Sequence, residues 1–80
     1  MTADQPINFE SSNERNAWII QHADYFVACR LIDRKRERHE AKTLDEARAL
    51  AKQLLKQNPK PLLIYAVEGI HDTFVEAVKA

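Results

Sequence analysis

The chain has 80 residues, of which 45% are hydrophobic and 30% are charged, and its formal net charge is zero. This length predicts one domain with a modest core. The zero net charge argues against a protein that binds nucleic acid by electrostatics alone, although it leaves room for a local basic patch. The single glycine excludes phosphate loops and dinucleotide fingerprints, which place several glycines beside phosphate.

Three features of the sequence predict a cytoplasmic protein. Cys29 is the one cysteine, so no internal disulfide can form, which fits a reducing compartment. The opening stretch, MTADQPINFESSNERN, is polar and acidic and does not resemble a signal peptide. No apolar run approaches the length that crosses a membrane.

We expect residues 1–16 to form a flexible tail and residues 17–80 to form a single α+β domain. Two interpretations compete over residues 11–22. Ser11 and Glu14 have the spacing of a capping box that opens a short helix, whereas AWIIQH can form an edge strand in a hairpin with the next strand. We favour the strand, and in either case we expect Trp18 to pack on the core.

Residues 25–32, YFVACRLI, are rich in β-forming residues and predict a strand. Phe26 and Ile32 fall on one face, where they are surplus apolar groups available to the N-terminal segment, a neighbouring chain or a partner. The alternation places on the other face, which we take as the core face, Tyr25, Val27, Cys29 and Leu31.

A polar hairpin is predicted next. Residues 33–36 indicate the loop, and residues 37–42, ERHEAK, indicate the returning strand. This second strand is polar almost throughout, so we expect it at a solvated edge of the sheet.

Residues 43–59, TLDEARALAKQLLKQNP, predict the main helix. Thr43 and Glu46 form a capping box, in which we expect the Glu46 carboxylate to accept from the backbone N–H of Thr43. Asn58 suits a left-handed position after the helix, and Pro59 cannot continue it. One stripe on a 3.6-residue period contains Leu44, Ala47, Leu50, Ala51, Leu54 and Leu55.

Two further segments complete the predicted fold. LLIYAVE at 62–68 is nearly continuously apolar, which is typical of a strand that is central or buried on both faces. TFVEAVK at 73–79 fits a helix or a hairpin strand after Gly69, and we favour the strand. The fold class is therefore α+β: an antiparallel sheet of four or five strands in ββαββ order, with one long helix on one face.

Basic charge gathers at the predicted hairpin. Residues 30–42 hold six cations against three acids, a net charge of +3, whereas residues 1–24 hold one Arg against four acids, a net charge of −3. Such a hairpin can bind phosphates or carboxylates through arginine forks, or it can be a solvated edge strand whose acids partly neutralise it. The candidate partner-binding residues are Arg30, Arg34, Lys35, Arg36, Arg38 and Lys42.

No residues in the sequence predict catalysis. No pair among the three histidines and Cys29 has the spacing of a zinc-ligand motif, so we expect neither a metal site nor a cofactor. No oxyanion-hole loop or activating motif flanks Cys29, which we expect to behave as a small hydrophobe. We therefore expect a protein that is not an enzyme.

The stretch YFVACRLIDRKRERHEAKTLDEARALAK resembles the AP2-like DNA-binding domains of phage integrases. In that family a basic hairpin precedes a helix that opens on a T-x-x-E-A pattern, here Thr43, Glu46 and Ala47. The resemblance implies DNA binding through the sheet face, although the segments after the helix depart from that family's plan.

The element order, size and near-neutral charge of about residues 25–79 also resemble the small phage-encoded anti-CRISPR proteins of ββαββ build. That resemblance implies a partner in a CRISPR surveillance complex, and it carries over no binding residue. We therefore expect a small interaction protein for a protein or ribonucleoprotein partner, with an anti-CRISPR inhibitor as its specific form. DNA binding by the sheet face and basic hairpin is one alternative, and an orphan homodimeric protein is another.

Overall fold

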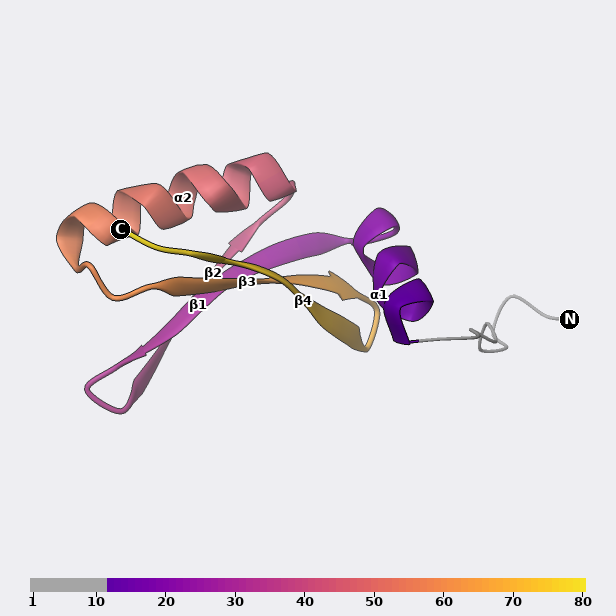
Figure 1. Ribbon diagram of the computed structural model, residues 1–80, viewed down its shortest axis with the longest axis horizontal. Helices are drawn as coiled ribbons and strands as arrows, with labels where there is room; N and C mark the ends of the chain where they lie inside the picture. The colour runs from indigo at the N-terminus through magenta and orange to yellow at the C-terminus, as the bar shows by residue number, and fades with distance from the viewer. Residues whose placement is uncertain (1–11) are drawn as a thin grey trace, which may run out of the picture.

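In the computed structural model, which describes residues 12–80, two helices pack against a four-stranded antiparallel sheet (Figure 1). The strand order across the sheet is β2-β1-β3-β4, so the two central strands come from opposite sides of the long helix. The elements in chain order are α1 (Ser12–Gln21), β1 (Tyr25–Ile32), β2 (Lys35–Ala41), α2 (Leu44–Gln57), β3 (Leu62–Glu68) and β4 (His71–Val78).

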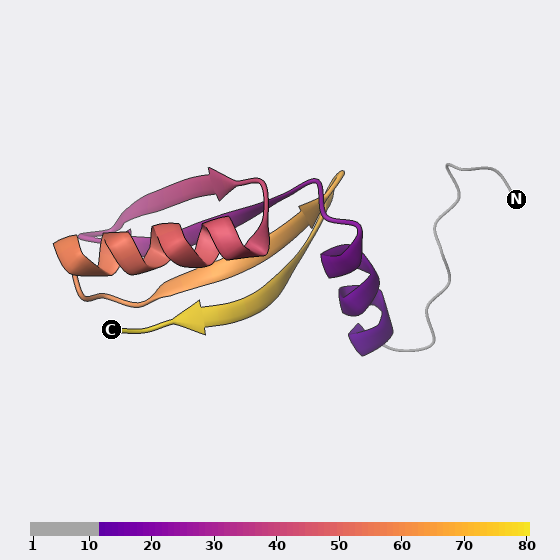
Figure 2. The ribbon, with the colours of Figure 1, turned by 90° about the horizontal axis from the view of Figure 1, so that it is seen from above.

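The two helices occupy different places on the sheet. Helix α2 lies along one face and contacts all four strands, whereas α1 packs against β3 and β4 at the end of the sheet (Figure 2). The core lies between α2 and the sheet, and α1 adds Ile19 to it. Its buried residues from the strands and α2 are Phe26, Ala28, Ala47, Ala51, Leu54, Leu62, Ile64, Ala66 and Val78.

Helix α2 confirms the predicted helix in its extent and at its start. The Thr43 hydroxyl accepts the Glu46 backbone N–H at 3.1 Å. The Glu46 carboxylate accepts the N–H of Lys42 at 3.1 Å, one residue earlier than we expected. At the other end Asn58 is extended (φ −150°), so the prediction of a left-handed residue there is wrong.

The first helix corrects our preferred interpretation of residues 11–22. We favoured a strand paired with β1, but both edges of β1 are already occupied, by β2 and β3. A helix instead buries Ile19 in the core and lets Trp18 and Ile20 pack against it, as expected for Trp18. Of the tail expected over residues 1–16, residues 1–11 lie outside the described residues, and the remainder belongs to α1.

Our assignment of the core face of β1 is also wrong. Phe26 is buried in the core under α2, whereas Leu31, which we placed in the core, is 53% exposed. The two faces of this strand are almost equally apolar, so alternation alone could not choose between them. Arg30 on the Phe26 side misled the choice, because a charged residue is seldom buried without partners.

The hairpin turn is shorter than we predicted. Asp33 and Arg34 both have positive φ, 51° and 69°, as a two-residue type I′ turn requires, so β2 begins already at Lys35. At the other edge of the sheet, the β3–β4 register shifts beside Ile64 and Tyr65, which leaves Val75 without a partner residue on β3. The bulge places Phe74 beside Tyr65 on one face and Glu76 beside Ile64 on the other.

Candidate functional site

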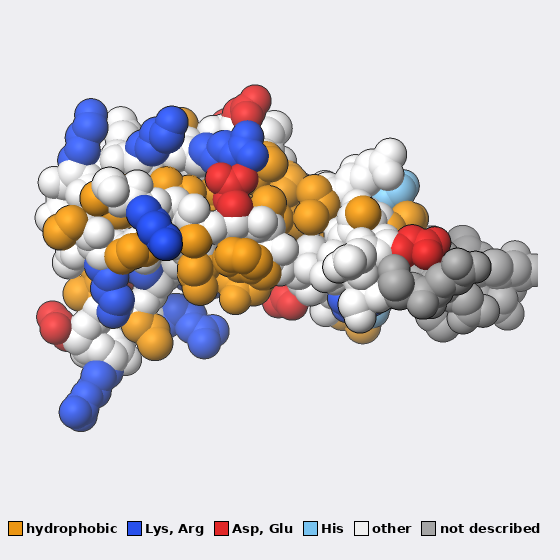
Figure 3. Space-filling view, viewed as in Figure 1, with side chains coloured by type: hydrophobic (Ala, Val, Ile, Leu, Met, Phe, Trp, Pro, Cys, Tyr) orange, Lys and Arg blue, Asp and Glu red, His pale blue; other side chains and the backbone are white. Residues whose placement is uncertain are grey.

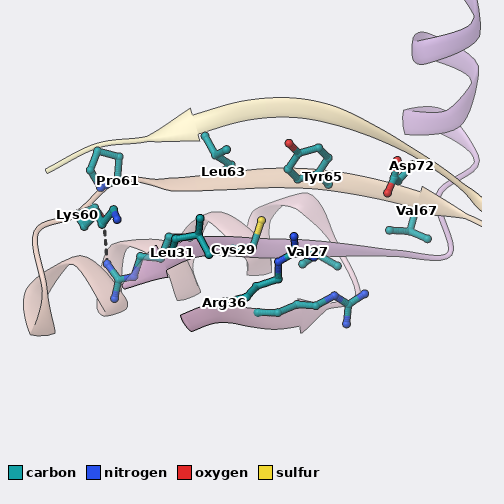
Figure 4. Close-up of a pocket in the computed structure, with 12 residues that line it drawn as sticks. Val27, Cys29, Leu31, Arg36, Lys60, Pro61, Leu63, Tyr65, Val67 and Asp72 are labelled. Atoms are coloured by element: carbon teal, nitrogen blue, oxygen red, sulfur yellow. Dashed lines mark hydrogen bonds between the residues drawn. The ribbon is translucent and has the colours of Figure 1, made fainter. Parts of the chain in front are cut away.

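Among residues 12–80, no helix crosses the sheet face opposite α2, which we call the open face. Strand β1 contributes Val27, Cys29 and Leu31 to this face. Val27 is paired with Tyr65 of β3, and Cys29 is paired with Leu63. These two rows of side chains lie side by side along a hollow of about 690 Å³ (Figure 4). The site is therefore the surface of the two central strands.

Large apolar groups on the open face are partly in water. Leu31 is 53% exposed, Leu63 is 38% exposed and Phe74 is 49% exposed. The Phe74 ring meets the Tyr65 ring edge to face, with centroids 5.8 Å apart. Single exposed apolar residues are ordinary, but neighbours gathered on one face mark an interaction surface.

Cations border the hollow along β2 and at the start of β3. Arg36 is the register partner of Leu31, Arg38 is the partner of Cys29, and Lys60 lines the hollow where the chain enters β3. Asp72 also lines the hollow. Asp72 and Arg36 lie at opposite ends of the hollow. Asp72 is paired with Val67, which is paired with Tyr25 at the start of β1, whereas Arg36 is paired with Leu31 near the end of β1.

These cations differ in whether a carboxylate binds their side chains. Arg38 donates to the Glu40 carboxylate at 2.6 Å, and hydrogen bonds to Glu40 and Tyr25 raise the pKa of its guanidinium. Within residues 12–80, no hydrogen bond or ion pair holds the side chain of Arg36 or Lys60. Both cations are therefore available to an anionic group on the open face.

Cys29 lies at the floor of the hollow and not in the core, where we expected it. Partial burial raises the pKa of its thiol, and the positive charges of Arg36 and Arg38 offset part of that shift. The thiol is thus mainly protonated at neutral pH, which makes it a weak nucleophile.

Arg30, the first of the predicted binding residues, is buried and serves the fold. Its Nη1 donates to the carbonyls of Asn58 and Lys60, both at 2.8 Å, and its Nη2 donates to the carbonyl of Leu54 at 3.2 Å. Its Nε donates to the Glu37 carboxylate at 2.8 Å. The guanidinium thereby satisfies carbonyls at the end of α2 and in the loop that follows.

The other five predicted residues lie in three places. Arg36 and Arg38 face the hollow. Arg34 is exposed in the turn, and Lys35 starts β2 on the side of α2, opposite Ile32. Lys42 is exposed between β2 and α2, at the far end of the strand from the turn. The predicted hairpin therefore contributes two cations to the site and not six.

Sequence reasoning missed Lys60, Leu63, Tyr65 and Phe74. Leu63 and Tyr65 follow from β3, because residues 61, 63, 65 and 67 of a strand share one face. We interpreted LLIYAVE as central or buried on both faces. It is central, but only the side toward α2 is fully covered.

Charge is unevenly distributed along the molecule. Figure 3 shows Lys and Arg side chains over the end that carries α2 and the β1–β2 hairpin, whereas uncharged side chains dominate around α1. The end of the open face that holds Arg36 and Lys60 therefore has the charge to attract an anionic group.

Comparison of the chain with protein-family models, curated proteins and solved structures finds no match. Across residues 12–80, no helix is long and apolar enough to span a membrane. In the same part of the chain, no three His, Cys, Asp or Glu side chains gather in a way that could hold a metal ion. Function must therefore be argued from the open face itself.

Proposed function

We propose that the protein is a small binding module, not an enzyme, and that it holds a protein or ribonucleoprotein partner against its open face. The proposal rests on one observation: half-exposed Leu31, Leu63 and Phe74 share a face with Arg36 and Lys60, two cations whose side chains have no ion pair within residues 12–80. A sheet normally buries an apolar face against a second layer. Here one layer, α2, covers one face.

The composition of the open face supports this proposal. The centres of protein interfaces are enriched in aromatic residues and Arg, and their rims are polar. Tyr65 and Phe74 supply the aromatic groups, while Arg36 and Arg38 supply planar forks that pair with carboxylates or phosphates. The apolar floor gives affinity through desolvation, and the cations set the position and orientation of the partner.

An inhibitor of the anti-CRISPR type is the specific form of this module that we propose. The resemblance in element order, together with the small size of the domain and its cationic rim, supports it. A ribonucleoprotein carries phosphates and protein surface together, and the open face offers groups for both.

A photo-cross-linking residue at position 63 tests the proposed function. With p-benzoylphenylalanine in place of Leu63, we expect irradiation of host cells to give discrete adducts of this chain. The same residue at Gln53, exposed on α2, is the matched control and should give none of them.

Charge reversal completes the test. Arg36→Glu together with Arg38→Glu should abolish the adducts from position 63, because the substitutions repel an anionic partner while leaving the core intact. Equal adducts from positions 63 and 53, or adducts that survive the double reversal, would show that the open face is not the binding surface.

A further inference from the structure

The open face carries flat aromatic surfaces on neighbouring strands. Tyr65 and Phe74 are cross-strand partners with ring centroids 5.8 Å apart, and Tyr25 lies on the same face one strand away, opposite Val67. Phe74 is 49% exposed, and both tyrosines are half-buried. Aromatic rings on an accessible sheet are stacking surfaces for unpaired bases, since every base has a π-face.

The cations of the open face lie along β2 and at one end of the hollow. Arg36 and Arg38 are alternate residues of β2, so their side chains leave the same side of the sheet roughly 7 Å apart. Lys60 lies at the same end of the hollow as Arg36. Two carboxylates share this face: Glu40 binds Arg38 at 2.6 Å and lies in the row of Val27 and Tyr65, and Asp72 sits at the other end of the hollow from Arg36. Arg36 and Lys60 therefore suit the phosphates at one end of a strand whose bases reach the aromatic groups.

We propose that the open face binds single-stranded nucleic acid, with bases stacked on Phe74 and Tyr65 and phosphates held by Arg36 and Lys60. This inference rests on the proposed function, because it names the component of the partner that lies on the same face. An exposed single strand is the part of a ribonucleoprotein that offers both unstacked bases and phosphates.

Other occupants match this surface less well. A second copy of the chain would bring the cations Arg36, Arg38 and Lys60 and the carboxylates Glu40 and Asp72 against the same set, so it would offer no net negative charge to the cations. A duplex keeps its bases stacked inside and presents only their edges in the grooves, which leaves Leu63 and Phe74 without apolar contact. A protein partner needs no stacking surface, and so it predicts a different response to loss of the Phe74 ring.

The test uses the full 80-residue chain and fluorescence anisotropy. The probes are fluorescein-labelled oligothymidylate and oligouridylate of about 12 nucleotides, within the range of roughly 4–16 nucleotides seen for OB folds. A duplex of the same length is the third probe. We expect both single strands to bind more tightly than the duplex, with an affinity that falls as the salt concentration rises.

Three variants separate stacking from charge. Phe74→Leu keeps the apolar bulk and should weaken single-strand binding about tenfold through loss of stacking. Arg36→Gln should flatten the slope of log K against log salt by about 0.7, the value for one phosphate contact on a single strand. Lys52→Gln, exposed on α2, is the matched control and should change neither quantity. Circular dichroism of each variant verifies that the fold is retained.

Each outcome is decisive. Equal or tighter binding to the duplex, or full affinity in Phe74→Leu, overturns the single-strand proposal. Absence of binding to all three probes at low salt, with specific adducts still formed from position 63, also overturns it but leaves the proposed function standing with a protein component on the face. Absence of both binding and adducts defeats the two proposals together.

Discussion

Arg30 and Glu37 face each other across the first hairpin and join their side chains at 2.8 Å beneath the end of α2. The Arg30 side chain is 2% exposed, so its charge depends on this carboxylate and on three backbone carbonyls. Arg30 of β1 thus forms hydrogen bonds with β2, with the end of α2 and with the loop that leads into β3.

Arg30→Met should lower the free energy of unfolding by about 3 kcal/mol, because it leaves buried acceptors without donors. Arg30→Lys keeps the positive charge but not the planar guanidinium, and its loss of unfolding free energy should be smaller than that of Arg30→Met. The double variant Arg30→Met/Glu37→Leu removes the carboxylate that Arg30→Met leaves unpaired. It should still be unstable, since the carbonyls of Asn58 and Lys60 lose the donor that Arg30 supplied. Urea denaturation followed by circular dichroism measures all three. Wild-type stability in Arg30→Met would show that these hydrogen bonds do not hold the helix end.

Neighbouring leucines at the start of β3 should differ sharply in their effect on stability. Leu62 is completely buried, so Leu62→Ala should cost about 3 kcal/mol by leaving a cavity. Leu63→Ala, on the open face, should cost less than about 1 kcal/mol. Its cost should appear instead as weaker partner binding. Thermal and urea denaturation compare the pair, and equal losses of stability would contradict the assignment of the two faces.

The ion pair between Arg48 and Glu76 should make stability depend on pH. The hydrogen bonds from Arg48, at 2.6 and 3.0 Å, hold the pKa of the Glu76 carboxyl below its usual value. A lowered pKa in the folded state stabilises the protein above the unfolded-state pKa, about 4.3 for Glu. That contribution is lost as the pH falls through the lowered pKa.

Glu76→Gln should therefore be less stable than the wild type at pH 7, and the difference should vanish in strong acid. Because both side chains are partly in water, the difference should be small and should also shrink in high salt. Urea titrations at several pH values measure it. A difference that stays constant down to strong acid would mean that the pair does not contribute.

Cys29 should report whether the open face is occupied. Because burial raises the pKa of its thiol, iodoacetamide should alkylate Cys29 more slowly than a free thiol at mildly alkaline pH. Replacing Arg36 and Arg38 by Gln removes nearby positive charge and should slow the reaction further. A bound partner should protect the thiol. Mass spectrometry follows the label, and faster alkylation in the double Gln variant would contradict the expected sign.

The sequence was sufficient for elements whose local signals agree. Helix α2 has a capping residue, an apolar stripe and a following proline, and the structure begins and ends it where these indicate. Strand β3 and the α+β class were also predicted correctly. In these segments local propensity and the demands of the core point the same way.

The rest depended on contacts between distant segments. Arg30 belongs to the core only because Glu37 and the carbonyls at the end of α2 surround it, and neither periodicity nor charge can show this. Residues 12–21 form a helix because β3, far along the chain, already pairs with β1. The candidate site moved from the hairpin to the open face for the same reason, since Lys60, Leu63 and Phe74 join it from later strands.

The bulge at Val75 bears on how the protein stays dispersed. Strand β4 is an edge strand, and an edge with a regular ladder of free amides recruits strands from other chains. A new strand along β4 would lose its hydrogen-bond register at Val75, and a strand along β2 would meet a row of charged side chains. Because neither edge strand favours the addition of a strand from another chain, the domain can expose an apolar face to water without forming fibrils.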